Sequence, residues 1–326
     1  MKQLVPSLLS AVAILAGCSP SETSTATLPA PAFEILEASP TPEPSATPFT
    51  LVLSDALGRS VEIVGAPQRV ISLSAPITSS FFTSGLQELL VGRDSSSIHP
   101  EEAETIPSLG DRFAEFDPAL FLPLEADLIL ADTNYPLESV LAIEALGLPV
   151  FVLPLATSLD DIYANLSLIG TLTDKQEAVD QSIAALSERM RAVEMALQDV
   201  DSRPAVFYEL EASDPTAPWT YGAGTILDEM LALAGGENVA ASLAGTWVQL
   251  PLSELQAADP AYILLADAAY GVSLESLQSR PGWDTLEAVQ QGQVLPFDES
   301  IISLPGPRII DAIEDLAALL HPDRYP

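Results

Sequence analysis

The sequence predicts an α/β protein built as two lobes joined by one long α-helix. Short apolar runs alternate with helix-like segments in both halves of the chain, as buried parallel strands alternate with helices. Between these halves, residues 173–200 contain no Gly or Pro and carry apolar side chains at three-to-four spacing, which is typical of an amphipathic helix. Two such lobes leave a cleft between them where a ligand can bind.

The first lobe is expected to cover residues 49–157. The segments LVL and VEIV predict two short strands joined by the turn SDALGRS, and RVISLS predicts a third. ADLILAD and LPVFVLP are apolar runs on either side of the helix-like PLESVLAIEALG. Such runs indicate parallel strands that are covered on both faces.

The connecting segment is expected at residues 158–202 and contains the interlobe helix, with Thr173 as its cap. Its predicted buried stripe consists of Val179, Ile183, Leu186, Met190, Val193 and Leu197. The second lobe is expected at 203–326. There AVFYEL, AYILLAD and QVLPF predict strands, GTILDEMLALAGG and SLESLQ predict helices, and a closing helix begins at Pro307.

The N-terminus has the pattern of a secretory leader. Lys2 precedes an apolar run from Leu4 to Leu15 that is too short to span a bilayer permanently. The following LAGC resembles a bacterial lipobox, so residues 1–17 are expected to be a signal peptide and Cys18 to be lipidated. An ordinary signal with a chance Cys is the alternative. Residues 18–48 are rich in Pro, Ser and Thr, which predicts a tether holding the protein outside the membrane.

Composition excludes several classes of function. A net charge of -34 argues against a nucleic-acid partner, because phosphates need cations. Cys18 is the one cysteine, so neither an intrachain disulfide nor a Cys-based zinc site is expected. With two histidines, no nucleophile elbow and no P-loop, an enzyme is not expected, nor is an intrinsic cofactor or metal site.

A few aromatic and basic residues are candidates for ligand binding. Trp219 and Tyr221 in PWTYG and Trp247 in GTWVQL are expected in loops, where flat rings suit a macrocycle or chelate; packing beneath their own loops is the alternative. Trp283 is expected to be structural. Arg308 lies at the start of the last helix and off its apolar stripe, so it is expected to face the cleft and an anionic group, or alternatively to pair with Asp298 or Asp311.

The order of several motifs resembles a known family across residues 49–326. These motifs are DALGRSVEIVGAPQRVISL, ADLILAD, LGLPVFVL, PWTYGAGTILDEMLALAGGENVAA, RPGWDTLEAVQQGQVLPFD and PGPRIIDAIEDLAALLHP. Together they resemble the substrate-binding lipoproteins of ABC importers for cobalamin, ferric siderophores and haem, the class III periplasmic binding proteins. The resemblance implies two Rossmann-like lobes bridged by a rigid helix, with the ligand between them.

The resemblance also implies site residues and partners. Its cleft positions correspond to Phe113, Leu210, Trp219, Trp247 and Arg308. The expected ligand is a metal chelate (corrinoid, ferric siderophore or haem), the expected partner is an ABC permease with its ATPase, and the protein is expected to act as a monomer. The acidic surface favours corrinoids or less anionic siderophores over highly anionic chelates.

Permease docking is where the chain departs from the family pattern. The glutamates that dock on the permease correspond to Ala119 and Ser253 here. Neighbouring acids that would replace them are Glu115, Asp117 and Glu254. Two alternatives therefore remain: an orphan ligand sensor or scavenger without a permease, and an extracytoplasmic enzyme on the same fold.

Overall fold

The computed structural model describes residues 49–114 and 116–325. The predicted signal peptide, Cys18, the tether and Glu115 lie outside these residues. The described residues belong to one unit of contacts. Within residues 49–114 and 116–325, no helix combines the length and the apolar character needed to cross a membrane.

The first lobe is built on a parallel sheet of four strands in the order β4-β3-β5-β6. These strands are β3 (Val70–Ser72), β4 (Leu90–Arg93), β5 (Leu128–Asp132) and β6 (Val150–Leu153). Every residue of β5 and β6 is buried, because helices cover both faces of the sheet; this explains their unbroken apolar runs. The strands expected in RVISLS, ADLILAD and LPVFVLP are therefore present, and β4 is an addition that the sequence pattern did not predict.

Smaller elements complete this lobe. An antiparallel pair, β1 (Thr50–Ser54) and β2 (Ser60–Val64), forms from the predicted LVL and VEIV strands. The helices are α1 (Ala75–Thr83), α2 (Pro118–Phe121) and α3 (Leu137–Glu144), with short 3-10 turns at η1 (Gln87–Leu89), η2 (Glu101–Thr105) and η3 (Leu122–Leu124).

Two antiparallel helices, α4 (Leu159–Thr173) and α5 (Gln176–Leu197), connect the lobes. The expectation that Thr173 caps the long helix is wrong. Thr173 is the last residue of α4, where its hydroxyl donates to the Ile169 carbonyl at 2.7 Å. Asp174 then adopts a left-handed conformation (φ 56°), which reverses the chain before α5 begins.

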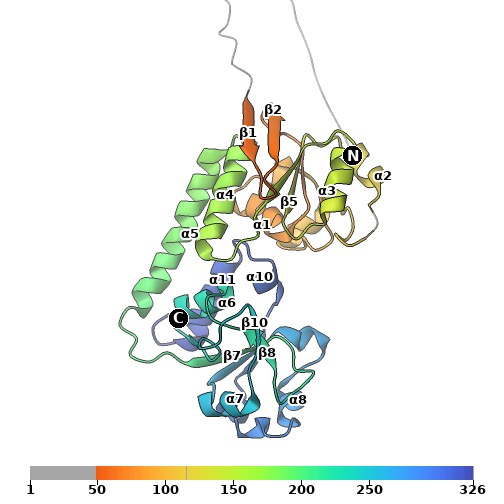
Figure 1. Ribbon diagram of the computed structural model, residues 1–326. Helices are drawn as coiled ribbons and strands as arrows, with labels where there is room; N and C mark the ends of the chain where they lie inside the picture. Colours follow the sequence, from red (N-terminus) through yellow and green to blue (C-terminus); the bar gives the residue numbers. More distant parts are fainter. Residues whose placement is uncertain (1–48, 115, 326) are drawn as a thin grey trace, which may run out of the picture. The chain divides into compact units, whose positions relative to one another are not determined.

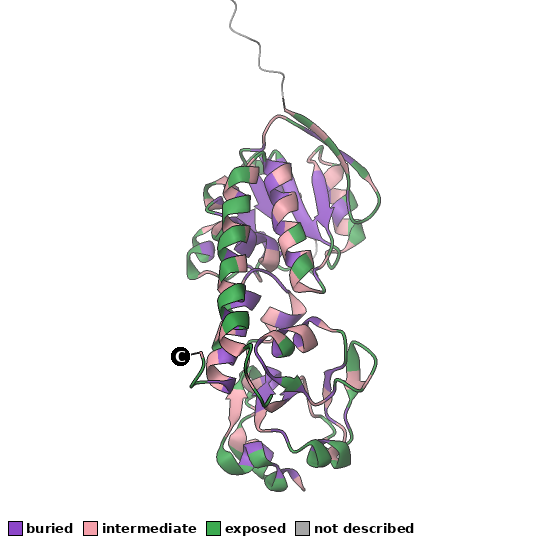
Figure 2. Ribbon diagram, turned by 90° about the vertical axis from the view of Figure 1, so that its left-hand side faces the viewer, coloured by how far each residue is buried: buried purple, intermediate pink, exposed green. Residues whose placement is uncertain are grey.

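The long helix α5 packs beside α4 in the first lobe and beside α11 (Ile309–Leu320) in the second (Figure 1). Of its predicted apolar stripe, Val179, Leu186, Met190 and Val193 are buried, while Ile183 and Leu197 are half-buried. Figure 2 shows the opposite face of this helix exposed. This amphipathic burial allows one rigid helix to be shared by both lobes.

The second lobe is built on a parallel sheet of four strands in the order β12-β11-β7-β9. These strands are β7 (Ala205–Glu209), β9 (Glu237–Asn238), β11 (Tyr262–Leu265) and β12 (Val294–Pro296). Around them lie α6 (Ile226–Leu233), α7 (Leu252–Ala258), α8 (Leu274–Gln278), α9 (Glu287–Gln291), α10 (Ser300–Ser303) and the turns η4 (Ala266–Tyr270) and η5 (Trp283–Thr285). The closing helix α11 begins two residues later than expected, with Arg308 at its N-cap position.

Two tryptophans expected in loops lie instead in short strands. Trp219 begins β8 (Trp219–Tyr221) and Trp247 begins β10 (Trp247–Gln249), and the two strands pair antiparallel. Trp283 is fully buried, and its indole N–H donates to the Pro215 carbonyl at 2.8 Å, which confirms its structural role. The pairing of β8 and β10 matters because it holds Tyr221 and Trp247 side by side.

Candidate functional site

A cavity of about 620 Å³ lies between loops of the two lobes and is called the aromatic cavity below. The first lobe contributes Asn134 and residues 155–157, which follow the carboxyl ends of β5 and β6. The second lobe contributes Leu210, Gly224, Tyr221, Thr225, Ile226, Thr246, Trp247, Glu299, Ile302, Ser303 and Pro305. Ligand sites of open α/β sheets lie outside the carboxyl ends of the strands, so this position is favourable for binding.

The aromatic wall of this cavity is built by the β8–β10 pair. Tyr221 and Trp247 are direct cross-strand partners; the Tyr221 side chain is buried, whereas Trp247 is 65% exposed. Burial raises the pKa of the Tyr221 hydroxyl, and a hydrogen bond from the Trp247 side chain opposes that rise. The register of β8 and β10 therefore places the indole of Trp247 beside Tyr221, and most of its surface is available for contact with a ligand.

Beneath the wall, Tyr221 packs edge-on against the fully buried Tyr208 at 5.8 Å between ring centroids. Two backbone hydrogen bonds to Trp219 position Leu210. The Leu210 N–H donates to the Trp219 carbonyl, and the Trp219 N–H donates to the Glu211 carbonyl. Leu210, Tyr221 and Trp247 are thus brought together as predicted ligand residues. Trp219 lies on β8 with Tyr221 and is half-buried, but it is not among the residues that line the aromatic cavity.

Arg308 lines a different cavity, of about 290 Å³, called the Arg308 cavity below. Ser79, Ser96 and His99 come to it from the first lobe and Asp298, Ser300 and Arg308 from the second. The Arg308 guanidinium contacts Asp298 at 2.7 Å and Ser300 Oγ at 3.4 Å, and His99 Nε2 lies 4.0 Å from Asp298. The structure therefore contains the ion pair between Arg308 and Asp298 that the sequence analysis gave as an alternative role for Arg308.

Asp298 is ionised in this arrangement. Burial acts to raise the pKa of its carboxyl, but hydrogen bonds from Ser300 and Arg308 bring the pKa below its usual value. The positive charge of Arg308 is therefore already balanced by a carboxylate. The guanidinium has five N–H donors, so it retains donor capacity for a neutral oxygen of a ligand.

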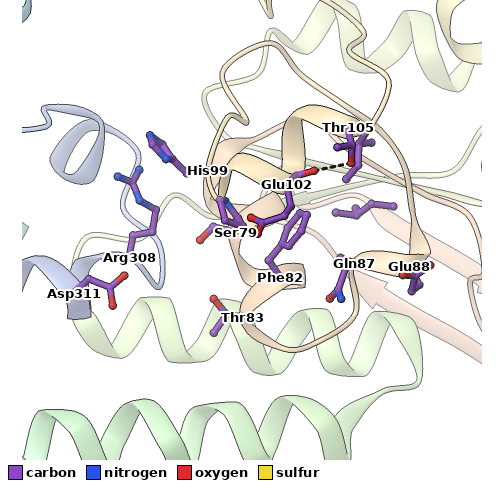
Figure 3. Close-up of a pocket in the computed structure, with 13 residues that line it drawn as sticks. Ser79, Phe82, Thr83, Gln87, Glu88, His99, Glu102, Thr105, Arg308 and Asp311 are labelled. Carbon is purple, nitrogen blue, oxygen red and sulfur yellow. Dashed lines mark hydrogen bonds between the residues drawn. The ribbon is translucent and has the colours of Figure 1, made fainter.

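Beside the Arg308 cavity lies an open groove of about 970 Å³ along α1, called the α1 groove below (Figure 3). Its walls include Phe82, Gln87, Glu88, His99, Glu102, Arg308 and Asp311. In Figure 3 the side chains of His99 and Arg308 point toward one another across the boundary between the lobes. Carboxylates outnumber cations in this groove, and Asp311 is itself held by Arg189 at 2.5 Å.

The remaining predicted residues lie away from these cavities. Phe113 is 80% exposed in a loop, with the Arg112 guanidinium 5.8 Å from its ring centroid, and its ligand contact stays a prediction. Asp117 caps α2, accepting from the Ala119 N–H at 2.9 Å, and Glu254 is exposed in the first turn of α7. Ala119 and Ser253 are exposed on the same two helices.

Sequence reasoning missed Asn134 and Glu299. Asn134 and Glu299 follow the carboxyl ends of β5 and β12 and line the aromatic cavity. Polar or aromatic residues just beyond a predicted parallel strand were the available signal, because such ends gather at one edge of a sheet. Within the described part of the chain, no group of three or more His, Cys, Asp or Glu is placed to hold a metal ion.

Known proteins agree with this architecture. A 27% identical relative, covering 85% of this chain and 87% of its own length, is an uncharacterized ABC transporter substrate-binding lipoprotein, YvrC, of Bacillus subtilis. A cobalamin-binding protein of Halobacterium salinarum is 25% identical over 84% of this chain and 74% of its own. A haem-binding protein, RhuT, of Roseiflexus has a similar fold, with a TM-score of 0.68 over 79% of this chain and 99% of its own at 24% identity.

The vitamin B12-binding protein BtuF of Vibrio cholerae also shares the fold, with a TM-score of 0.60 at 23% identity over 78% of this chain and 97% of its own. These comparisons confirm the predicted two-lobed architecture with its bridging helix. The profile of the periplasmic binding protein family matches residues 70–300, which is more than half of the chain. With this match, the predicted function class is confirmed: the chain belongs to the periplasmic binding protein family, whose members bind solutes for ABC import systems outside the cytoplasmic membrane.

Proposed function

We propose that this protein captures a metal chelate (a corrinoid, a ferric siderophore or haem) and passes it to the permease and ATPase of an ABC importer. The proposal rests on the aromatic cavity, where Trp247, backed by the buried Tyr221, presents a flat surface between the carboxyl edges of two sheets. Planar rings suit a macrocycle or an aromatic chelate. The relatives named for cobalamin and the fold neighbours named for haem support this ligand class.

In this proposal the ligand is cargo, not a cofactor, and no covalent step occurs. Leu210, Tyr221 and Trp247 hold its flat face, and Arg308 donates N–H groups to an oxygen on its edge. Phe113 and Trp219 would contact parts of a large ligand that protrude beyond the cavity. The rigid α5 supports small movements of the lobes when the ligand binds, because both lobes pack on it.

Lipidation of Cys18 and the domain limits 1–17, 18–48, 49–157, 158–202 and 203–326 are part of the proposal. A Cys18→Ser variant is expected to leave the membrane fraction and appear in the soluble extracytoplasmic fraction. Metabolic labelling with a radioactive fatty acid checks the same point. Equal membrane retention of the variant would contradict the anchor.

Binding is tested by titrating the full chain with cobalamin, cobinamide, haem and several ferric siderophores while following tryptophan fluorescence. Quenching with a dissociation constant in the micromolar range or below is expected for at least one of them, because Trp247 lies exposed in the cavity wall. Calorimetry with the same compounds controls for optical artefacts. Absence of binding to every compound would remove the chelate proposal.

A second candidate is a sensor or scavenger that binds the ligand without a permease. It is favoured by Ala119 and Ser253, which occupy the exposed positions where the family carries docking glutamates. Asp117 and Glu254 are described neighbours that would replace them, although the Asp117 carboxylate also caps α2. Ligand-stimulated ATPase activity of a reconstituted, co-encoded transporter, lowered by Asp117→Ala together with Glu254→Ala, supports delivery; unchanged ATPase activity with bound ligand supports the sensor.

A further inference from the structure

The aromatic cavity contains one charged side chain among its lining residues, and that side chain is the carboxylate of Glu299. Glu299 is half-buried in the loop after β12, and its Oε2 accepts a hydrogen bond from Ser303 Oγ at 3.1 Å. The rest of the wall is apolar, aromatic or uncharged polar. A ligand group that approaches Trp247 and Tyr221 therefore meets a negative charge in a partly desolvated setting, where charge interactions are stronger than in water.

No cation compensates for this charge at the boundary between the lobes, as far as the described lining residues show. Arg308 lies in the Arg308 cavity and is matched by Asp298 at 2.7 Å. In the α1 groove, Glu88 and Glu102 add further carboxylates, and the nearby Arg189 is paired with Asp311 and Glu314. The binding face therefore has no surplus positive charge with which to hold an anion.

The cavity instead offers what a neutral or cationic ligand requires. A carboxylate accepts N–H donors, and the exposed face of an indole attracts a cation. Asn134, across the cavity from the second lobe, carries an amide that can donate to and accept from an amide. The turn that carries Asn134 is held by the buried Asp132, which accepts from the Asn134 backbone N–H at 2.8 Å and from the Ser74 hydroxyl.

We propose that Glu299 determines specificity: the aromatic cavity selects chelates that are uncharged or cationic and bear amide or ammonium donors, and it rejects chelates that present carboxylates or other anionic groups. This inference rests on the proposed function and narrows its ligand class. Arg308 then contacts a neutral carbonyl oxygen, not an anion. The acidic composition of the whole chain acts in the same direction at long range, whereas Glu299 acts at contact.

The test compares pairs of probes that differ mainly in the charge of their peripheral groups. Cobinamide is compared with a corrinoid in which one peripheral amide is hydrolysed to a carboxylate, and haem dimethyl ester is compared with haem. The wild-type protein is expected to bind the amide or ester member of at least one pair about tenfold more tightly than its carboxylated counterpart. Calorimetry at fixed pH and at two salt concentrations measures the ratio.

Glu299→Gln is expected to bring this ratio close to one by tightening the binding of the carboxylated probe. Glu62→Gln, on the exposed face of β2, makes the same change in net charge away from the cavity and is expected to leave the ratio unchanged. Equal or tighter binding of the carboxylated probes to the wild type would overturn the inference and leave chelate capture intact. Binding of an anionic ferric siderophore in place of all four probes would also overturn the inference and leave chelate capture intact. Failure of the four probes and of every ferric siderophore to bind would overturn chelate capture and the inference with it.

Discussion

The aromatic cavity and the Arg308 cavity lie at the same boundary between the lobes but satisfy their polar groups in different ways. In the Arg308 cavity, Arg308, Asp298 and Ser300 contact one another, so most of their interaction energy is internal to the protein. In the aromatic cavity, Trp247 keeps most of its surface exposed, and Glu299 is the one charged side chain among the described lining residues. Binding free energy is therefore expected to come mainly from the aromatic cavity, while the Arg308 cavity orients the ligand.

The largest effect is expected from Trp247→Ala. Loss of the exposed indole removes the apolar surface that a flat ligand would cover, which lowers affinity by about 2 kcal/mol, or about thirtyfold. The free energy of unfolding is expected to change by less than about 0.5 kcal/mol, because the side chain is exposed. Calorimetric titration and thermal unfolding measure the two quantities. Unchanged affinity would remove Trp247 from the site.

The second prediction concerns the pH dependence of stability, which depends on buried charged residues near the end of β7. Glu209 ends β7, is fully buried and forms a two-bond pair with Arg280, and burial together with the nearby Glu209 raises the pKa of Asp267 to about 7. Between about pH 4 and about pH 7, the Asp267 carboxyl is protonated in the native state, whereas the same carboxyl is already ionised in the unfolded chain. The free energy of unfolding is therefore expected to fall as pH rises from about 4 to about 7 and then to level off.

Asp267→Asn tests this assignment. The variant is expected to be more stable than the wild type at pH 8, by about 1–2 kcal/mol, and to show a weaker dependence of melting temperature on pH between 4 and 7. Denaturant unfolding at several pH values measures the difference. A wild-type profile that rises steadily over this interval, unaltered by the substitution, would contradict a raised pKa at Asp267.

A smaller effect is expected from Arg308→Ala. The change removes donors for the ligand edge and leaves the Asp298 carboxylate without its cation, so affinity falls about five- to tenfold. Stability is expected to change little, because both partners are partly exposed. Asp298→Asn in the same background serves as the control for the unpaired carboxylate. Equal affinity in Arg308→Ala would assign Arg308 a purely structural pairing role.

The smallest effect is expected from Phe113→Ala. The ring is 80% exposed and lies outside the lining of the aromatic cavity, so only a protruding part of the ligand would touch it. Affinity is expected to fall about two- to threefold, without a change in melting temperature. Titration with one small and one large ligand separates the outcomes: a loss above tenfold for both would show that the first lobe contributes a second main surface.

Local sequence was enough to predict the strands, the long helix and most of the aromatic wall. Apolar runs such as ADLILAD favour fully buried strands, and the stripe from Val179 to Val193 favours a helix with one buried face. The cap at Thr173 was wrong because its hydroxyl bonds back to Ile169 inside α4. Trp219 and Trp247 were placed in loops because strands of three residues leave no periodic pattern.

By itself the sequence determined the α/β fold, the two lobes and the family, since these follow from patterns that repeat along the chain. Only the tertiary structure decided that Tyr221 and Trp247 are paired, that Arg308 is matched by Asp298, and that Asn134 and Glu299 line one cavity. Residues 134 and 299 are far apart in sequence, and no local pattern relates them. They meet because the carboxyl ends of parallel strands converge at one edge of each sheet, and folding brings those edges together.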